Sequence, residues 1–215
     1  MSAELTLDEI EKIESLKAFW KDHHRKILAG LVVVVVTAAA IVWWKQHQYR
    51  TNAEAASLYA SIQGMQQIGQ PAAIATLTDT LLKRYPDTSY AARGALIGAA
   101  AAMQANNTAL ARTDWQWVLD HSKESGLQTI ARLRLAGLLL DSNQPQQALQ
   151  LLDTPHDETS ADVYNDLKGD VLVRLGQLDA ARAAWRIALE KLPPDSPYRQ
   201  VIEIKLNAIA GVAAK

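Results

Sequence analysis

The side chains best suited to acid–base or metal chemistry are the histidines and one pair of adjacent carboxylates. The histidines are His23, His24, His47, His121 and His156. No two of them stand four residues apart around a glutamate, as zinc proteases require. The adjacent acids Asp157 and Glu158 lie in a Pro/Thr/Ser-rich stretch, where we expect a solvated loop and helix cap. The chain also lacks a nucleophile elbow and a phosphate-binding loop, so we predict no catalytic residue, metal or cofactor.

The composition excludes further classes. Lys and Arg total 22 against 23 Asp and Glu, a formal net charge of -1 that argues against a nucleic-acid binder. The absence of cysteine excludes a disulfide scaffold, a thiol nucleophile and cysteine-ligated metals. With 49% hydrophobic residues, most of the 215-residue chain can bury a core, so we predict a folded chain.

Residues 27–44 form an uninterrupted apolar segment without a charged side chain. As a helix it would be about 27 Å long, close to the hydrocarbon thickness of a lipid bilayer. Charge resumes at once on both sides, and tryptophans lie at both ends, as at membrane interfaces. The predicted boundary residues are Trp20, Arg25, Lys26, Trp43, Trp44 and Lys45.

Two other interpretations of this segment are weaker. The core helix of a soluble protein would usually carry a polar face, yet Thr37 is the only clearly polar residue here. A cleaved signal peptide could use the small residues at 38–40, but the apolar run continues to Trp44 without a polar exit. We therefore predict a transmembrane helix.

The basic residues near this helix predict its orientation. Five lie on its N-terminal side, and two lie at a similar distance on its C-terminal side. The positive-inside rule then places residues 1–26 in the cytoplasm and residues 45–215 across the membrane, which is the periplasm if the source is a Gram-negative bacterium. The N-terminal residues are Lys12, Lys17, Lys21, Arg25 and Lys26, and the C-terminal ones are Lys45 and Arg50.

The leader, residues 1–26, contains an amphipathic helix signal. Thr6 and Glu9 have the spacing of a capping box. Apolar residues then recur every three or four positions, giving one stripe. They are Ile10, Ile13, Leu16 and Trp20. This helix would lie on the lipid headgroups or dock a cytoplasmic or membrane partner.

The pattern of residues 45–215 predicts an all-α solenoid of helix pairs. The clearest unit, 162–195, has the length of a tetratricopeptide repeat and its pattern of small residues opposite a large one. It carries Gly169, Leu172, Gly176, Ala181, Trp185, Ala188 and Pro193. Three degenerate copies precede it, and 196–210 would form a capping helix. The alternative is a generic Ala-rich helix bundle.

The first helix of each pair should line the inner face of such a solenoid. The residues expected there are Tyr59, Gln63, Gln66, Ala95, Ala99, Ala102, Met103, Arg134, Leu138, Asp141, Asp166, Asp170 and Arg174. This mixed face lacks the clustered cations that would hold a terminal carboxylate, so we expect it to recognise a polypeptide surface. Arg134 and Asp170 would alternatively form an ion pair joining neighbouring helices.

Several motifs resemble a known family over nearly the whole chain. They are KAFW at 17–20, AASLY at 55–59, YPDTSYA at 85–91, IARLRLA at 130–136 and KGD at 168–170. In this order they resemble the YfgM-type ancillary subunits of the bacterial SecYEG translocon. The resemblance implies an inner-membrane protein that associates with the translocon and with a membrane-anchored periplasmic chaperone of the prolyl-isomerase type.

Two alternative functions remain at this level. The leader would bind a cytoplasmic signalling protein, so that the chain acts as a regulator of envelope stress. Otherwise, the repeats would bind a cell-wall partner, as in an envelope or division scaffold. In all three interpretations the chain is not an enzyme.

Overall fold

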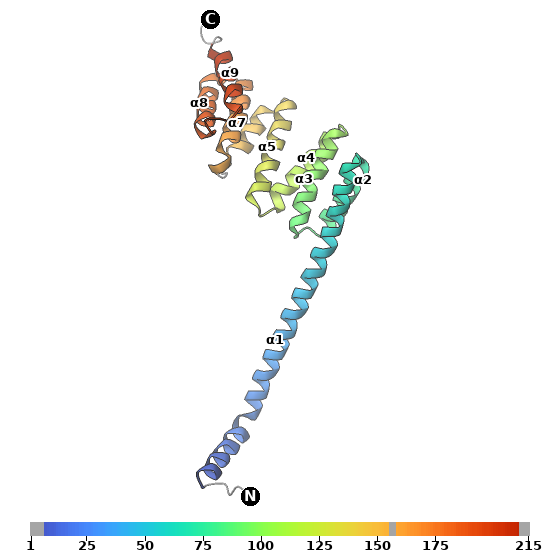
Figure 1. The fold of residues 1–215 in the computed structure, drawn as a ribbon, viewed down its shortest axis with the longest axis vertical. Helices are drawn as coiled ribbons and strands as arrows, with labels where there is room; N and C mark the ends of the chain where they lie inside the picture. The colour runs from blue at the N-terminus through green and yellow to red at the C-terminus, as the bar shows by residue number, and fades with distance from the viewer. Residues whose placement is uncertain (1–6, 155–157, 211–215) are drawn as a thin grey trace. The chain divides into compact units, whose positions relative to one another are not determined.

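The computed structural model describes residues 7–154 and 158–210 (Figure 1). These residues divide into two compact units, Met1–Thr51 and Asn52–Lys215, which we describe separately. Thr6, His156 and Asp157 lie outside the described residues. The predicted capping box, which needs Thr6, and the predicted acidic loop, which needs Asp157, therefore stay predictions.

The first unit consists of most of helix α1 (Leu7–Gln67), which continues into the second unit. The side chains of residues 28–50 are all exposed, and no part of the apolar window is buried. The stretch His23–Gln67 of α1 is the one candidate membrane span among the described residues. A soluble core helix would be mostly buried, so its exposure favours the predicted transmembrane helix. The six predicted boundary residues are exposed around this segment, and their role at a membrane stays a prediction.

The described part of the second unit is helical and contains no strand, which confirms the predicted all-α class. Residues 52–67 of α1 pair with α2, and the later helices pair as α3 with α4, α5 with α6 and α7 with α8, before the single helix α9. Their bounds are α2 (Pro71–Arg84), α3 (Ser89–Gln104), α4 (Thr108–His121), α5 (Ser125–Asp141), α6 (Pro145–Leu152), α7 (Ala161–Arg174), α8 (Leu178–Lys191) and α9 (Tyr198–Ala210). A short 3₁₀ turn, Glu158–Ser160, precedes α7.

Each pair is joined by the same turn. The residue that ends the first helix has a positive φ, between 57° and 73°, which glycine and asparagine adopt most readily. The next backbone N–H donates back to the carbonyl five residues earlier at 2.8–3.0 Å, as in a Schellman motif. The turn residues are Gly69, Asn106, Asn143 and Gly176. They recur at close to the tetratricopeptide period, and they define four repeats in the described chain.

Small residues on first helices meet large ones on second helices. In the last repeat, a Cβ on Gly169 would overlap the indole of Trp185. The Trp185 Nε1–H donates to the carbonyl of Asp166 at 3.0 Å, so the close approach also satisfies the indole donor. One repeat period earlier the corresponding pair is Ala136 and Leu152, both buried. The packing predicted for the last unit is confirmed.

Helix α9 closes the last repeat. Ile202 and Ile209 are buried in the same cluster as Trp185 and Ala188 of α8. Ile202 lies one repeat period after Gly169 and is buried like it, so α9 takes the place of a further first helix. The predicted capping helix is therefore present, because an open solenoid end would leave this apolar surface in water.

A buried carboxyl in α4 was not expected from the sequence. The side chain of Asp114 is 5% exposed, and its Oδ2 atom has no hydrogen-bond partner among the described residues. Oδ2 lies against Gly98, where an added Cβ would come within 2.8 Å of it. Burial raises the pKa of Asp114 to about 6, with a further contribution from the charge of Asp79. Between about pH 4 and pH 6, the Asp114 carboxyl therefore keeps its proton in the folded domain, whereas in the unfolded chain it has lost that proton.

We expect Gly169→Ala to destabilise the repeat domain by about 1–3 kcal/mol, because the added methyl overpacks the site beside Trp185. Urea denaturation of the full chain in detergent micelles, followed by circular dichroism, measures this change. The control is Gly64→Ala, whose Cβ would meet nothing within 4 Å and which should stabilise α1 by about 0.5–1 kcal/mol. Equal effects of the two substitutions would contradict a packing role for Gly169.

We expect Asp114→Asn to stabilise the domain at neutral pH. Because the folded pKa is raised, the folded state binds more protons than the unfolded state, so stability falls as pH rises from about 4 to about 6. At about 1.4 kcal/mol per pKa unit, the loss at neutral pH is up to about 3 kcal/mol.

Urea midpoints of the wild type and Asp114→Asn should differ at pH 7.5 and converge near pH 4. Asp120→Asn is the matched control, since Asp120 is an exposed residue of the same helix. A stability difference that does not change with pH would show that the Asp114 carboxyl does not titrate in this range.

Candidate polypeptide-binding groove

A groove of about 680 Å³ lies between α3 and α5, with additional lining from α4 and α7. Its volume is within the range of small-ligand and peptide sites. Its lining is mostly apolar and includes two charged side chains. The lining residues are Leu96, Ala100, Met103, Trp115, Ile130, Leu133, Arg134, Gly137, Leu138, Asp141 and Leu167. Among the described residues no cluster of His, Asp and Glu could hold a metal ion.

On α3, the residues that line the groove lie one position after the three alanines predicted for the inner face. Leu96, Ala100 and Met103 recur at helical spacing and line the groove. The predicted Ala95, Ala99 and Ala102 are instead buried in the core, so their assignment to the inner face is wrong. Alanine occupies both faces of α3, so its apolar periodicity does not distinguish the buried face from the groove face.

The wall formed by α5 contains the expected residues Arg134, Leu138 and Asp141, together with Gly137. The structure therefore brings Arg134, Leu138 and the α3 residue Met103 into one groove. Leu138 contributes only its edge, because 8% of its surface is exposed. Whether these residues contact a partner stays a prediction.

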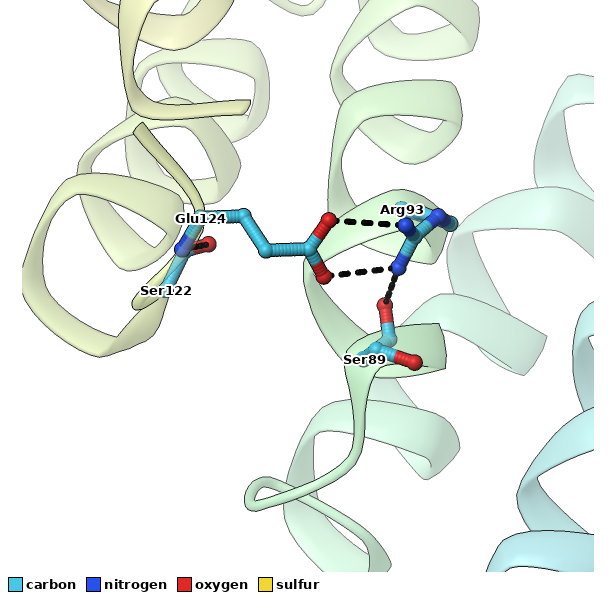
Figure 2. Close-up of polar contacts among 4 residues, drawn as sticks. All are labelled: Ser89, Arg93, Ser122 and Glu124. Carbon is cyan, nitrogen blue, oxygen red and sulfur yellow. Dashed lines mark hydrogen bonds and ion pairs between the residues drawn. The ribbon is translucent and has the colours of Figure 1, made fainter. Parts of the chain in front are cut away.

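An ion pair joins the two walls near the start of both helices (Figure 2). Arg93 lies one turn before Leu96 on α3 and donates two hydrogen bonds to the Glu124 carboxylate, at 2.9 and 2.7 Å. Its Nη1 also donates to the Ser89 carbonyl, while the Ser122 hydroxyl accepts from the Glu124 N–H. Both charged side chains are partly exposed, so this pair fixes spacing more than it adds stability. Sequence reasoning did not identify it.

Arg134 and Asp141 are the groove charges that have no partner among the described residues. Neither forms an ion pair or a hydrogen bond through its side chain within the part of the chain that the structure describes. They are seven residues apart on α5, which corresponds to about 10.5 Å along the helix axis. The groove thus offers one exposed cation and one exposed anion beside an apolar lining.

The expected alternative of an Arg134–Asp170 ion pair is wrong, because Asp170 pairs with Lys205 of α9. The Lys205 ammonium donates to Asp166 at 2.7 Å and to Asp170 at 2.8 Å. It also lies 5.8 Å from the centroid of the Trp185 ring. The capping helix therefore covers part of the inner face that was predicted at the last repeat.

Burial and charge act against each other in this cluster. Burial raises the pKa of Asp170, although Lys205 pulls that pKa in the opposite direction. Burial alone would lower the pKa of Lys205, but its hydrogen bonds with Asp166 and Asp170 outweigh burial and raise it. Lys205 is therefore a structural cation that holds α9 against α7.

The remaining predicted contact residues lie outside this groove. Tyr59 packs against Tyr90 with ring centroids 5.7 Å apart, and Gln63 donates to the Tyr59 hydroxyl at 3.4 Å. Gln66 is exposed on α1. Arg174 donates to the side chain of Asn143 in the turn between α5 and α6. A binding role for these residues stays a prediction.

The comparisons with known proteins agree with this architecture. The Tetratricopeptide repeat-like domain family matches residues 17–211. An ancillary SecYEG translocon subunit of Neisseria gonorrhoeae is 29% identical over 204 residues, covering 94% of this chain and 98% of that protein. Its counterpart in Escherichia coli K12 is 23% identical, covering 96% of this chain and 99% of that protein. The names and the repeat fold describe a scaffold rather than an enzyme. The chain therefore belongs to the tetratricopeptide repeat-like domain family, and it is similar over nearly its full length to ancillary SecYEG translocon subunits.

Proposed function

We propose that this chain is a non-enzymatic, single-span scaffold of the bacterial inner membrane that associates with the SecYEG translocon. The observation that carries the proposal is the similarity to ancillary translocon subunits along almost the entire length of both chains. Because the match covers 94–96% of this chain, it includes the exposed apolar part of α1 as well as the repeats.

In this proposal the repeats face the periplasm. Five Lys and Arg residues precede the apolar segment and two follow it, which favours an N-terminus in the cytoplasm. Exposed tryptophans at the ends of the segment support its placement across the bilayer. The α3–α5 groove would then be available to polypeptides that have crossed the membrane.

The groove would bind a membrane-anchored periplasmic chaperone of the prolyl-isomerase type, emerging secretory chains, or both. Its apolar lining suits unfolded or partly folded segments, whose apolar side chains are not yet buried. Anchoring confines the groove and its partners to the same membrane, which raises their effective concentration without a tight contact. A modest, adaptable site is then sufficient for a scaffold.

We expect protease added to sealed, inverted inner-membrane vesicles to leave the repeats intact. In the proposed orientation these vesicles enclose residues 52–215 and expose the leader. An antibody against the C-terminal half would detect the protected fragment, and detergent permeabilisation should make it sensitive. Digestion in sealed vesicles would place the repeats in the cytoplasm and overturn the orientation.

We expect a photo-crosslinker at Ala100 to capture partners in intact membranes, because Ala100 is an exposed residue of the groove. Mass spectrometry should identify a translocon subunit, a prolyl-isomerase-type chaperone or secretory chains. The matched control is Ala183, an alanine of α8 that does not line the groove. Equal capture of these proteins from both positions would contradict the groove as their binding site.

A further inference from the structure

Gly137 is one of three glycines in the described repeat helices, with Gly64 and Gly126, whose added Cβ would meet nothing within 4 Å, and it is the one of the three in the middle of its helix. A glycine in a helix interior is less stable than alanine there, so packing usually accounts for it. Gly94, Gly98 and Gly169 have such a reason, since a Cβ on each would collide with a neighbouring side chain. A Cβ on Gly137 would meet nothing within 4 Å, although Gly137 lies in the middle of α5.

The open space beside Gly137 is the groove itself. Gly137 is the only glycine among the residues that line it, whereas Gly64 also has open space but does not line it. The preceding Ala136 is fully buried and makes the helix–helix contact, so Gly137 is not needed for packing. One repeat earlier the corresponding groove residue is Ala100, also small. At these two positions, the backbones of α3 and α5 are nearly uncovered toward the groove.

The free charges lie on either side of this glycine. Arg134 is one turn before Gly137, and Asp141 is one turn after it. The nearby Arg93 and Glu124 do not line the groove and already neutralise each other. A ligand that crosses Gly137 therefore meets one cation and one anion about 10.5 Å apart. In a polyproline-II-like extended chain, which rises about 3.1 Å per residue with three residues per turn, side chains three residues apart lie on the same side and span about 9 Å.

We propose that the groove binds an extended, polyproline-II-like and largely apolar polypeptide segment whose backbone crosses Gly137, and whose acidic and basic side chains, three residues apart, face Arg134 and Asp141. This inference rests on the proposed function and names the ligand class of the same groove. A helical ligand fits less well, because its surrounding side chains would keep its backbone away from that of Gly137. Gly137 is thus a specificity-determining residue that keeps the groove open.

The test is fluorescence anisotropy with labelled ten-residue peptides and the full chain in detergent micelles. The main probe is an apolar peptide with one Glu and one Lys three residues apart. Comparison peptides carry two Glu, two Lys, or the Glu and Lys seven residues apart, as a helical ligand would need. We expect the main probe to bind at least tenfold more tightly than each comparison peptide.

Gly137→Leu should weaken binding of the main probe at least tenfold without lowering the melting temperature, since its side chain enters open space. Gly64→Leu is the matched control and should leave binding unchanged. Arg134→Glu should shift the preference to the peptide with two Lys, and adding Asp141→Lys should restore the mixed peptide. If Gly137→Leu unfolds the chain, Gly137→Ala and the two charge variants decide the question.

Unchanged binding to folded Gly137→Leu, or equal binding of all four peptides, would overturn the inference. Crosslinking to the translocon can persist in that case, and the proposed function then stands without this ligand class. Conversely, if the peptides bind as expected but the chain in intact membranes crosslinks to no translocon subunit, the proposed function fails while the peptide specificity holds.

Discussion

The left-handed residue that ends the first helix of every pair is the constraint on which the rest of the repeat domain depends. At Gly69, Asn106, Asn143 and Gly176 the backbone adopts a positive φ, so the helix stops and the chain reverses within a few residues. Reversal makes each pair antiparallel, and the spacing of the turns determines which residues of successive helices meet. The buried core and the groove both follow from this spacing, because moving one turn by a residue would rotate the next helix by about 100°.

Helix approach depends on size complementarity between neighbouring helices. Within the last pair Gly169 accepts the Trp185 indole, and between the first two pairs Leu81 of α2 packs over Gly94 of α3. Such contacts fill space efficiently, but they leave little room for change at the buried positions. The groove follows from the same geometry. On a first helix, the residue that follows a buried contact residue is turned away from the partner helix. Ala136 is buried in this way, and the next residue, Gly137, lines the groove.

Paired and unpaired charges occupy different parts of the inner face. At the start of α3 and α5 the Arg93–Glu124 pair neutralises its own charges, and at α9 the single cation Lys205 is shared by two carboxylates of α7. Between these two places Arg134 and Asp141 have no partner among the described residues. The structural ion pairs thus lie outside the groove lining, and the charges available to a ligand lie within it.

Local sequence patterns by themselves determined the apolar segment at 27–44, the last repeat and the capping helix, because each depends on residues close together in the chain. They also named Met103, Arg134 and Leu138, which the structure brings into one groove. Only the tertiary structure decided which face of the alanine-rich α3 is buried, since alanine marks neither face. It alone also decided that Asp170 pairs with Lys205, a residue of the capping helix. Such choices depend on how helices from different repeats stack, and no local periodicity contains that information.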